Sequence, residues 1–207
     1  MKKLRFGIFL LVFSLLASSP VFAQTNKKAE LKRIDAYSKT IDAFVKKHKS
    51  PQLIFADVSD YDADKPEWRR YDSEREFEKA RETVESYNTA YVWRKNGRIV
   101  MANFTLSSPS GDWAQYVYHY FRADGSAAKV ESELRTFHGN LIVVQDFYLD
   151  PKGRVLKKTL KYLDLETQKP KKPSKDDLLD NGDNLYRVEY YKKTSKLPFT
   201  ALLKGKK

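Results

Sequence analysis

The amino-acid sequence predicts an α+β fold in which two N-terminal amphipathic helices pack on a six- to seven-stranded antiparallel β-meander. Three turn signals support this prediction. Their glycines, Gly97, Gly125 and Gly153, are 28 residues apart each time (125 − 97 and 153 − 125). Each turn follows an aromatic or aliphatic run, and Asn-Gly, Asp-Gly and Pro-Lys-Gly are turn sequences of β-hairpins. A hairpin that recurs at a fixed period is typical of a meander.

Residues 1–23 have the pattern of a signal peptide. A basic start (Lys2, Lys3, Arg5) precedes an apolar run over 6–16, and a cleavage sequence ends at Ala23. The run is shorter than the roughly 20 residues of a membrane-spanning helix. We therefore expect an exported protein, periplasmic or secreted after cleavage. An uncleaved anchor is the alternative.

The mature chain, residues 24–207, would have 184 residues (207 − 23), enough for a single α+β domain. It has no cysteine, which excludes disulfides and thiolate metal sites. Its net charge is +9 (36 − 27), although residues 57–87 hold 11 acidic and 6 basic side chains. A basic exported protein favours anionic membrane surfaces or acidic glycans as partners, and not nucleic acid. The alternative is that the basic surface only keeps the protein soluble.

Two amphipathic helices are predicted, over 29–49 and 73–86. Ser50-Pro51 ends the first, because the residue before a proline avoids the helical region. Ser73 and Glu76 fit a capping box at the start of the second. We expect both helices to cover the sheet. A basic amphipathic helix lying on an anionic membrane is the alternative for the first.

The β-meander is predicted over 89–163. Its expected strands are 89–95, 98–107, 113–122, 127–136, 140–149 and 154–163. The short apolar stretch 52–58 is a candidate edge strand. A polar loop (167–183) and a terminal strand with a basic tail (184–207) complete the chain.

An acidic loop after residue 57 resembles part of a calcium site. Asp60, Asp62 and Asp64 match the first three ligand positions of an EF-hand loop. However, Lys65 stands where that loop needs glycine and Tyr71 where it needs a bidentate glutamate. No metal site is therefore predicted, and a looser calcium site is kept as an alternative.

Hairpin register predicts two different sheet faces. With two-residue turns, Trp93 would pair with Val100 and Tyr91 with Ala102, and His119, Val117 and Phe121 would share their face. This apolar face is expected to lie under the helices. On the other face Tyr116, Tyr118 and Tyr120 would stand opposite Glu133, Glu131 and Lys129, with Arg94 and Asn103 on the same side.

The tyrosine-bearing face is the candidate binding site. Tyrosines among charged residues suit stacking against sugar rings or an extended peptide. The predicted ligand-binding residues are Tyr116, Tyr118, Tyr120, Arg94 and Asn103. Tyrosine is also simply a good strand residue for half-exposed positions, which is the competing explanation.

Catalytic residues and cofactors are not predicted. The chain has three histidines and no pair of them at metal-ligand spacing, no G-x-S-x-G sequence and no phosphate-binding loop. Glu131 and Glu133 could act on a glycoside only if their pKa values separated, which an open sheet does not favour. The sequence thus favours a non-catalytic binding or interaction protein of the bacterial cell envelope, with glycan or peptide as ligand. A periplasmic carrier of lipid in a curved sheet is the alternative, because residues 141–144 are apolar on both faces.

Two resemblances concern the central part of the chain. The units Tyr118–Gly125 and Phe147–Gly153 resemble exported hairpin-repeat families of the YD type. The order of helix and meander is similar to that of periplasmic lipoprotein carriers, a resemblance that implies an apolar ligand. Neither assigns a functional residue.

Overall fold

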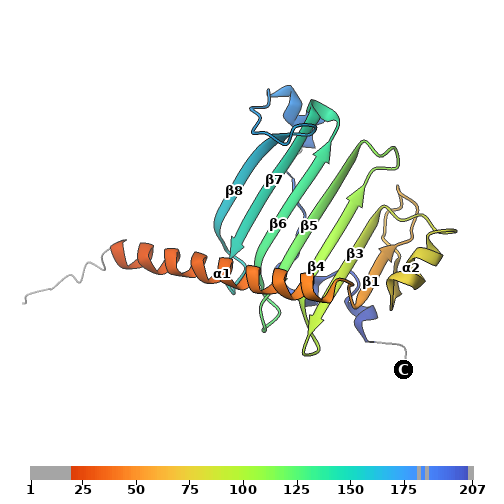
Figure 1. Cartoon of the computed structure of the whole chain (residues 1–207), viewed down its shortest axis with the longest axis horizontal. Coiled ribbons are helices and arrows are strands. Elements are labelled where there is room, and N and C mark those ends of the chain that lie inside the picture. Colours follow the sequence, from red (N-terminus) through yellow and green to blue (C-terminus); the bar gives the residue numbers. More distant parts are fainter. Residues whose placement is uncertain (1–19, 181–182, 185–186, 205–207) are drawn as a thin grey trace, which may run out of the picture.

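The protein is mostly β in the computed structural model, which describes residues 20–180, 183–184 and 187–204 (Figure 1). One antiparallel sheet has eight strands in the order β2-β1-β3-β4-β5-β6-β7-β8. The strands are β1 (Leu53–Asp57), β2 (Trp68–Tyr71), β3 (Asn88–Lys95), β4 (Arg98–Ser107), β5 (Trp113–Phe121), β6 (Ala127–Thr136), β7 (Leu141–Leu149) and β8 (Val155–Asp164). A small separate pair consists of β9 (Leu179–Asp180) and β10 (Asp183–Asn184).

The meander itself agrees with the sequence prediction, because β3 to β8 begin and end within one residue of the expected strands. The predicted strand number was too low, since the sheet has eight strands. The short apolar stretch forms β1, which pairs with β3 on one side and β2 on the other and is therefore not an edge. The outer strand β2 has the sequence Trp-Arg-Arg-Tyr, which lacks the alternation that marks a half-buried strand.

The prediction of two N-terminal helices packed on the meander was wrong. Only α1 (Pro20–His48) is an N-terminal helix, and α2 (Glu74–Ala80) has seven residues between β2 and β3. The side chain of Ser73 caps α2 by accepting a hydrogen bond from the Glu76 backbone N–H at 3.2 Å. The helix stops early, and the β-branched Thr83 and Val84 that follow both donate backbone hydrogen bonds to the Ala80 carbonyl, at 3.1 and 3.0 Å.

The N-terminal helix starts inside the predicted signal peptide. Residues 1–19 lie outside the described part of the chain, and α1 begins at Pro20. Cleavage after Ala23 would therefore remove residues 20–23 from the helix. Among the described residues, no helix is long and apolar enough to cross a membrane.

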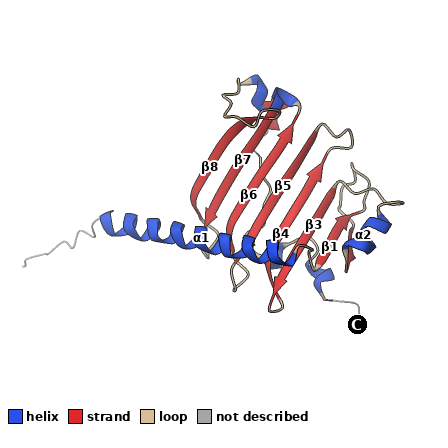
Figure 2. Cartoon of the chain, viewed as in Figure 1, coloured by secondary structure: helices blue, strands red, loops and turns tan. Residues whose placement is uncertain are grey.

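The two sheet faces are covered by different parts of the chain. On one face α1 crosses the strands near their turn ends, and α2 packs at the β1–β2 edge (Figure 2). On the other face lies the C-terminal segment, residues 187–203, where Leu197 and Phe199 are buried. The Phe199 ring stacks on Phe55 at 4.0 Å between centroids. The helices were expected on the face that carries His119, Val117 and Phe121. In the structure both helices lie on the other face, which carries Tyr120.

A terminal strand was expected after residue 184. Residues 187–191 have no regular secondary structure, and residues 185–186 lie outside the described part. The segment is held by backbone hydrogen bonds at single points, from Ala127 N–H to the Lys192 carbonyl and from Thr194 N–H to the Gly125 carbonyl, both at 2.9 Å. It docks on the sheet mainly through apolar contacts.

His119 anchors the C-terminal segment from inside the core. Its Nε2 accepts a hydrogen bond from the Tyr191 backbone N–H at 3.0 Å, so its Nδ1 carries the proton and faces the Val117 carbonyl at 3.3 Å. The ring is fully buried beside Phe104 and Phe121, which confirms its predicted core position. This burial lowers the pKa of His119 to about 4.

The buried imidazole makes stability depend on pH. The folded pKa of about 4 lies below the unfolded value of 6.5, so the unfolded chain takes up the proton first as pH falls. Stability is therefore lost between pH 6.5 and 4, by about 3 kcal/mol from the 2.5-unit difference (6.5 − 4). We expect the stability gap between the wild type and His119→Gln, measured by urea unfolding, to shrink by about that amount from pH 7 to pH 4. A gap that stays constant would contradict this role.

Candidate functional site

The tyrosine row has the predicted register. Tyr116, Tyr118 and Tyr120 of β5 stand opposite Glu133, Glu131 and Lys129 of β6. This agreement results from two departures that cancel. The turn before Gly125 is a type I turn with a glycine bulge, which shifts the pairing by one residue, and a β-bulge at Ala128 shifts it back.

The first hairpin departs from its predicted register. Its Asn96-Gly97 turn has two residues, both at positive φ as expected, but a bulge follows between Trp93 and Arg94. Trp93 consequently pairs with Met101, and Tyr91 with Asn103. A one-residue slip moves side chains to the other face, so Tyr91 and Trp93 lie on the tyrosine face and not on the opposite apolar one.

Two of the five predicted site residues therefore do not stand at an open part of the tyrosine face. Arg94 pairs with Ile99, whose side chain belongs to the core on the opposite face, so Arg94 does not join the tyrosines. Tyr120 is 2% exposed, because Ile41 of α1 packs over it. The structure does bring Tyr116, Tyr118 and Asn103 together, since Asn103 and Tyr118 are direct cross-strand partners.

Tyr120 has become part of the contact between helix and sheet. Its hydroxyl lies 2.9 Å from Asp42 Oδ1 and 3.0 Å from Glu131 Oε2, and it has one proton to donate. Burial, followed by the charges of Glu131 and Asp42, raises the pKa of Tyr120 far above its ordinary value. The phenol therefore remains a neutral donor that ties α1 to β6.

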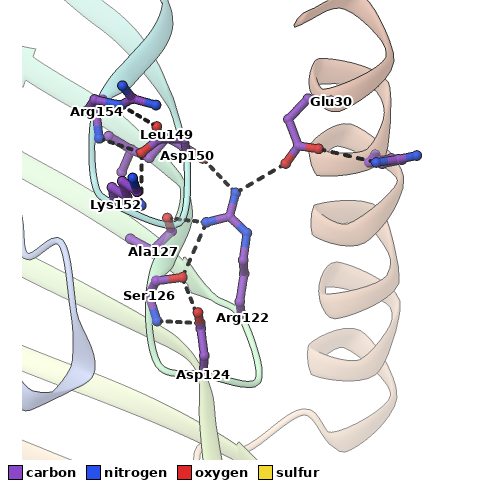
Figure 3. A network of polar contacts seen from close by, with 10 residues as sticks. Glu30, Arg122, Asp124, Ser126, Ala127, Leu149, Asp150, Lys152 and Arg154 are labelled. Atoms are coloured by element: carbon purple, nitrogen blue, oxygen red, sulfur yellow. Dashed lines mark hydrogen bonds and ion pairs between the residues drawn. The ribbon is translucent and has the colours of Figure 1, made fainter. Parts of the chain in front are cut away.

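A second network fixes α1 where the hairpin turns meet. The Arg122 guanidinium donates 2.6 Å hydrogen bonds to the carbonyls of Ala127 and Leu149, and it lies 3.7 Å from the Glu30 carboxylate of α1 (Figure 3). Within α1, Asp35 accepts a 2.8 Å hydrogen bond from the Tyr148 hydroxyl. These polar contacts position the helix across one end of the face.

The rest of this face is not covered by either helix. We call the surface around Tyr116, Tyr118, Asn103 and Thr105, which are all half-buried, the open tyrosine surface. Burial, followed by the nearby Glu133, raises the pKa of Tyr118. The Asn103 Oδ1 atom is buried and has no hydrogen-bond partner among the described residues.

Two acidic residues next to the open tyrosine surface, Glu131 and Glu133, are already paired. Glu133 accepts a 2.6 Å hydrogen bond from Arg135, and Glu131 a 2.5 Å hydrogen bond from Lys129. Both carboxylates thus have a cationic partner on their own strand. In the part of the chain that the structure describes, no three acidic or histidine side chains converge as metal ligands, and Asp60, Asp62 and Asp64 are exposed. The arrangement offers aromatic and hydrogen-bonding contacts and little net charge.

Sequence reasoning missed Tyr91, which stands on the same face between the two helices. Only the bulge in β4 could have signalled it, and the sequence Ile-Val-Met there has no glycine to mark it. No family model, curated protein or solved structure matches the chain.

The two central tyrosines should differ in what their hydroxyls contribute to stability. Tyr120→Phe removes the donor shared by Asp42 and Glu131, so we expect the free energy of unfolding to fall by about 1 kcal/mol. Tyr118→Phe is the matched control, because its hydroxyl has no hydrogen bond to a described residue, and we expect a change below about 0.5 kcal/mol. Chemical denaturation measures both. Equal effects would show that the Tyr120 hydroxyl does not hold α1.

Proposed function

We propose that this protein is an exported, non-catalytic binding protein of the bacterial cell envelope, whose ligand contacts the open tyrosine surface. The observation that supports this most directly is the position of Tyr116 and Tyr118. They are neighbours on one sheet face and half-buried, and Tyr118 borders the cluster through which Ile41 of α1 packs on the sheet. The N-terminal sequence pattern supports export.

Neutral glycans fit the chemistry of this surface better than peptides do. The carboxylates of Glu131 and Glu133 are compensated by Lys129 and Arg135, so these two residues leave little excess charge beside the tyrosines. Tyrosine rings pack against the apolar sides of sugar rings, while amide and hydroxyl groups bind sugar hydroxyls. An extended peptide would instead pair with the edge of a sheet. The edge strand β8 is rich in exposed lysines, which oppose such pairing.

The carrier alternative has less support from the packing. A carrier needs space for an apolar ligand against the sheet, and the chain fills the apolar face with its own C-terminal segment. Phe199 packs on Phe55, Phe104 and Trp68, and Tyr190 packs on Phe147.

Replacing the two tyrosines tests the proposal. We expect a glycan array to find a neutral oligosaccharide that binds residues 24–207, and calorimetry to give its affinity. Tyr116→Ala and Tyr118→Ala should each weaken that affinity by roughly 2- to 10-fold, from the approximate 0.5–1.5 kcal/mol of an aromatic contact. Tyr61→Ala is the matched control, because Tyr61 is 58% exposed and lies in the loop between β1 and β2.

Three results would contradict the proposal. Undiminished affinity in both variants would place the glycan elsewhere. Binding only to envelope peptides would replace glycan by peptide as ligand. Acyl chains that co-purify with the wild type, found by lipid extraction and mass spectrometry, would favour the carrier.

A further inference from the structure

The helix α1 separates its charges between two sides. Its acidic side chains are Glu30, Asp35 and Asp42, and all three reach the sheet. Glu30 meets Arg122 at 3.7 Å, and the other two accept hydrogen bonds from tyrosine hydroxyls, at 2.8 and 2.9 Å. Each acidic side chain of the helix is therefore engaged with a group of the sheet or its turns.

The basic side chains of α1 remain at its surface. The exposed ones are Lys27, Lys28, Lys32, Arg33, Lys39, Lys46 and Lys47. Lys32, Lys39 and Lys46 follow one another at intervals of seven residues (39 − 32 and 46 − 39), nearly two helical turns, so they form one line along the helix. None of these three forms an ion pair with a described residue.

The edge strand β8 adds to this basic surface. Lys157 pairs with Tyr148 and Lys161 with Val144, which puts both lysines on the sheet face that α1 crosses. Both are exposed. The lysine line of α1 and the lysines of β8 therefore face the same side of the molecule.

We propose that the outer side of α1 docks on the surface of an anionic lipid bilayer. The helix has 29 residues, of which cleavage after Ala23 would leave 25 (29 − 4), about 38 Å at roughly 1.5 Å per residue, and it lies on the sheet as a ridge whose N-terminal turns project beyond β8 (Figure 1). A long convex row of unpaired cations matches a flat partner that carries many negative charges. It does not match a small anion, which needs a concave site.

This contact is electrostatic and peripheral. The apolar residues Ile34 and Ile41 pack on the sheet, whereas the exposed apolar residues on the outer side are the alanines Ala29, Ala36 and Ala43. Over residues 26–48, whose side chains the structure describes, the outer side of the helix thus presents no large apolar side chain for insertion into the bilayer. Each lysine near an anionic surface contributes through charge alone, so added salt should release the protein.

Vesicle sedimentation of residues 24–207 tests the proposal. We expect binding to phosphatidylcholine vesicles that contain phosphatidylglycerol, no binding to phosphatidylcholine alone, and release by salt. The variant K32E/K39E/K46E should partition more than about tenfold more weakly. The matched control is K193E/K196E/K204E, which makes the same change of net charge in the C-terminal segment of the opposite face and at the residue that follows it, and it should differ from the wild type by less than about threefold. K32A/K39A/K46A is a second variant, which removes the same three positive charges and places alanine, a better helix former than glutamate, at each position.

Equal weakening in the two charge-reversal variants would show that net charge, and not α1, governs binding, and would overturn the proposal. So would equal binding to neutral vesicles, or binding to soluble heparin without binding to vesicles, which would assign the lysine line to an anionic polymer. Glycan binding should be the same in K32E/K39E/K46E and the wild type, because the open tyrosine surface does not include these lysines.

Discussion

The sheet is apolar on both faces at the end where its long hairpins turn, and this constraint shapes the rest of the molecule. Leu197 and Phe199 of the C-terminal segment cover one face, and Ile34 and Ile41 of α1 cover the other. Arg122 couples the two hairpin turns to the helix. Because α1 crosses this face near one end of the strands, the far end of the tyrosine face stays open, and a binding surface becomes available there.

Hairpin turns explain why so much of the meander could be predicted. A turn glycine such as Gly125 or Gly153 sets the pairing of the strands on either side, so strand positions follow from local sequence alone. Faces are less secure, because one bulge moves every later residue. The bulge at Ala128 compensated a turn, but the one near Val100 had no counterpart, and the assignment of Tyr91 and Trp93 was wrong for that reason.

The helix and the site could be predicted only in part. The stripe of Ile34 and Ile41 shows which side of α1 is buried but not which sheet face receives it, since both faces are apolar there. The C-terminal segment also covers a sheet face. Its two buried residues, Leu197 and Phe199, follow a polar loop and give only a weak signal in the sequence. Tyr118 and Tyr120 are tyrosines on the same face of the same strand. Only the point at which α1 crosses that strand leaves Tyr118 half-buried and Tyr120 buried.

The two proposed surfaces share one orientation. Because α1 lies on the tyrosine face, its lysine line and the open tyrosine surface look to the same side of the molecule. A helix is about 10 Å thick, so a protein that rests on α1 would hold Tyr116 and Tyr118 at about that height above the bilayer. This gap suits a glycan attached to the same membrane. The paired charges of Glu131 and Glu133 matter here, because unpaired carboxylates on that face would repel the anionic surface that the helix is proposed to bind.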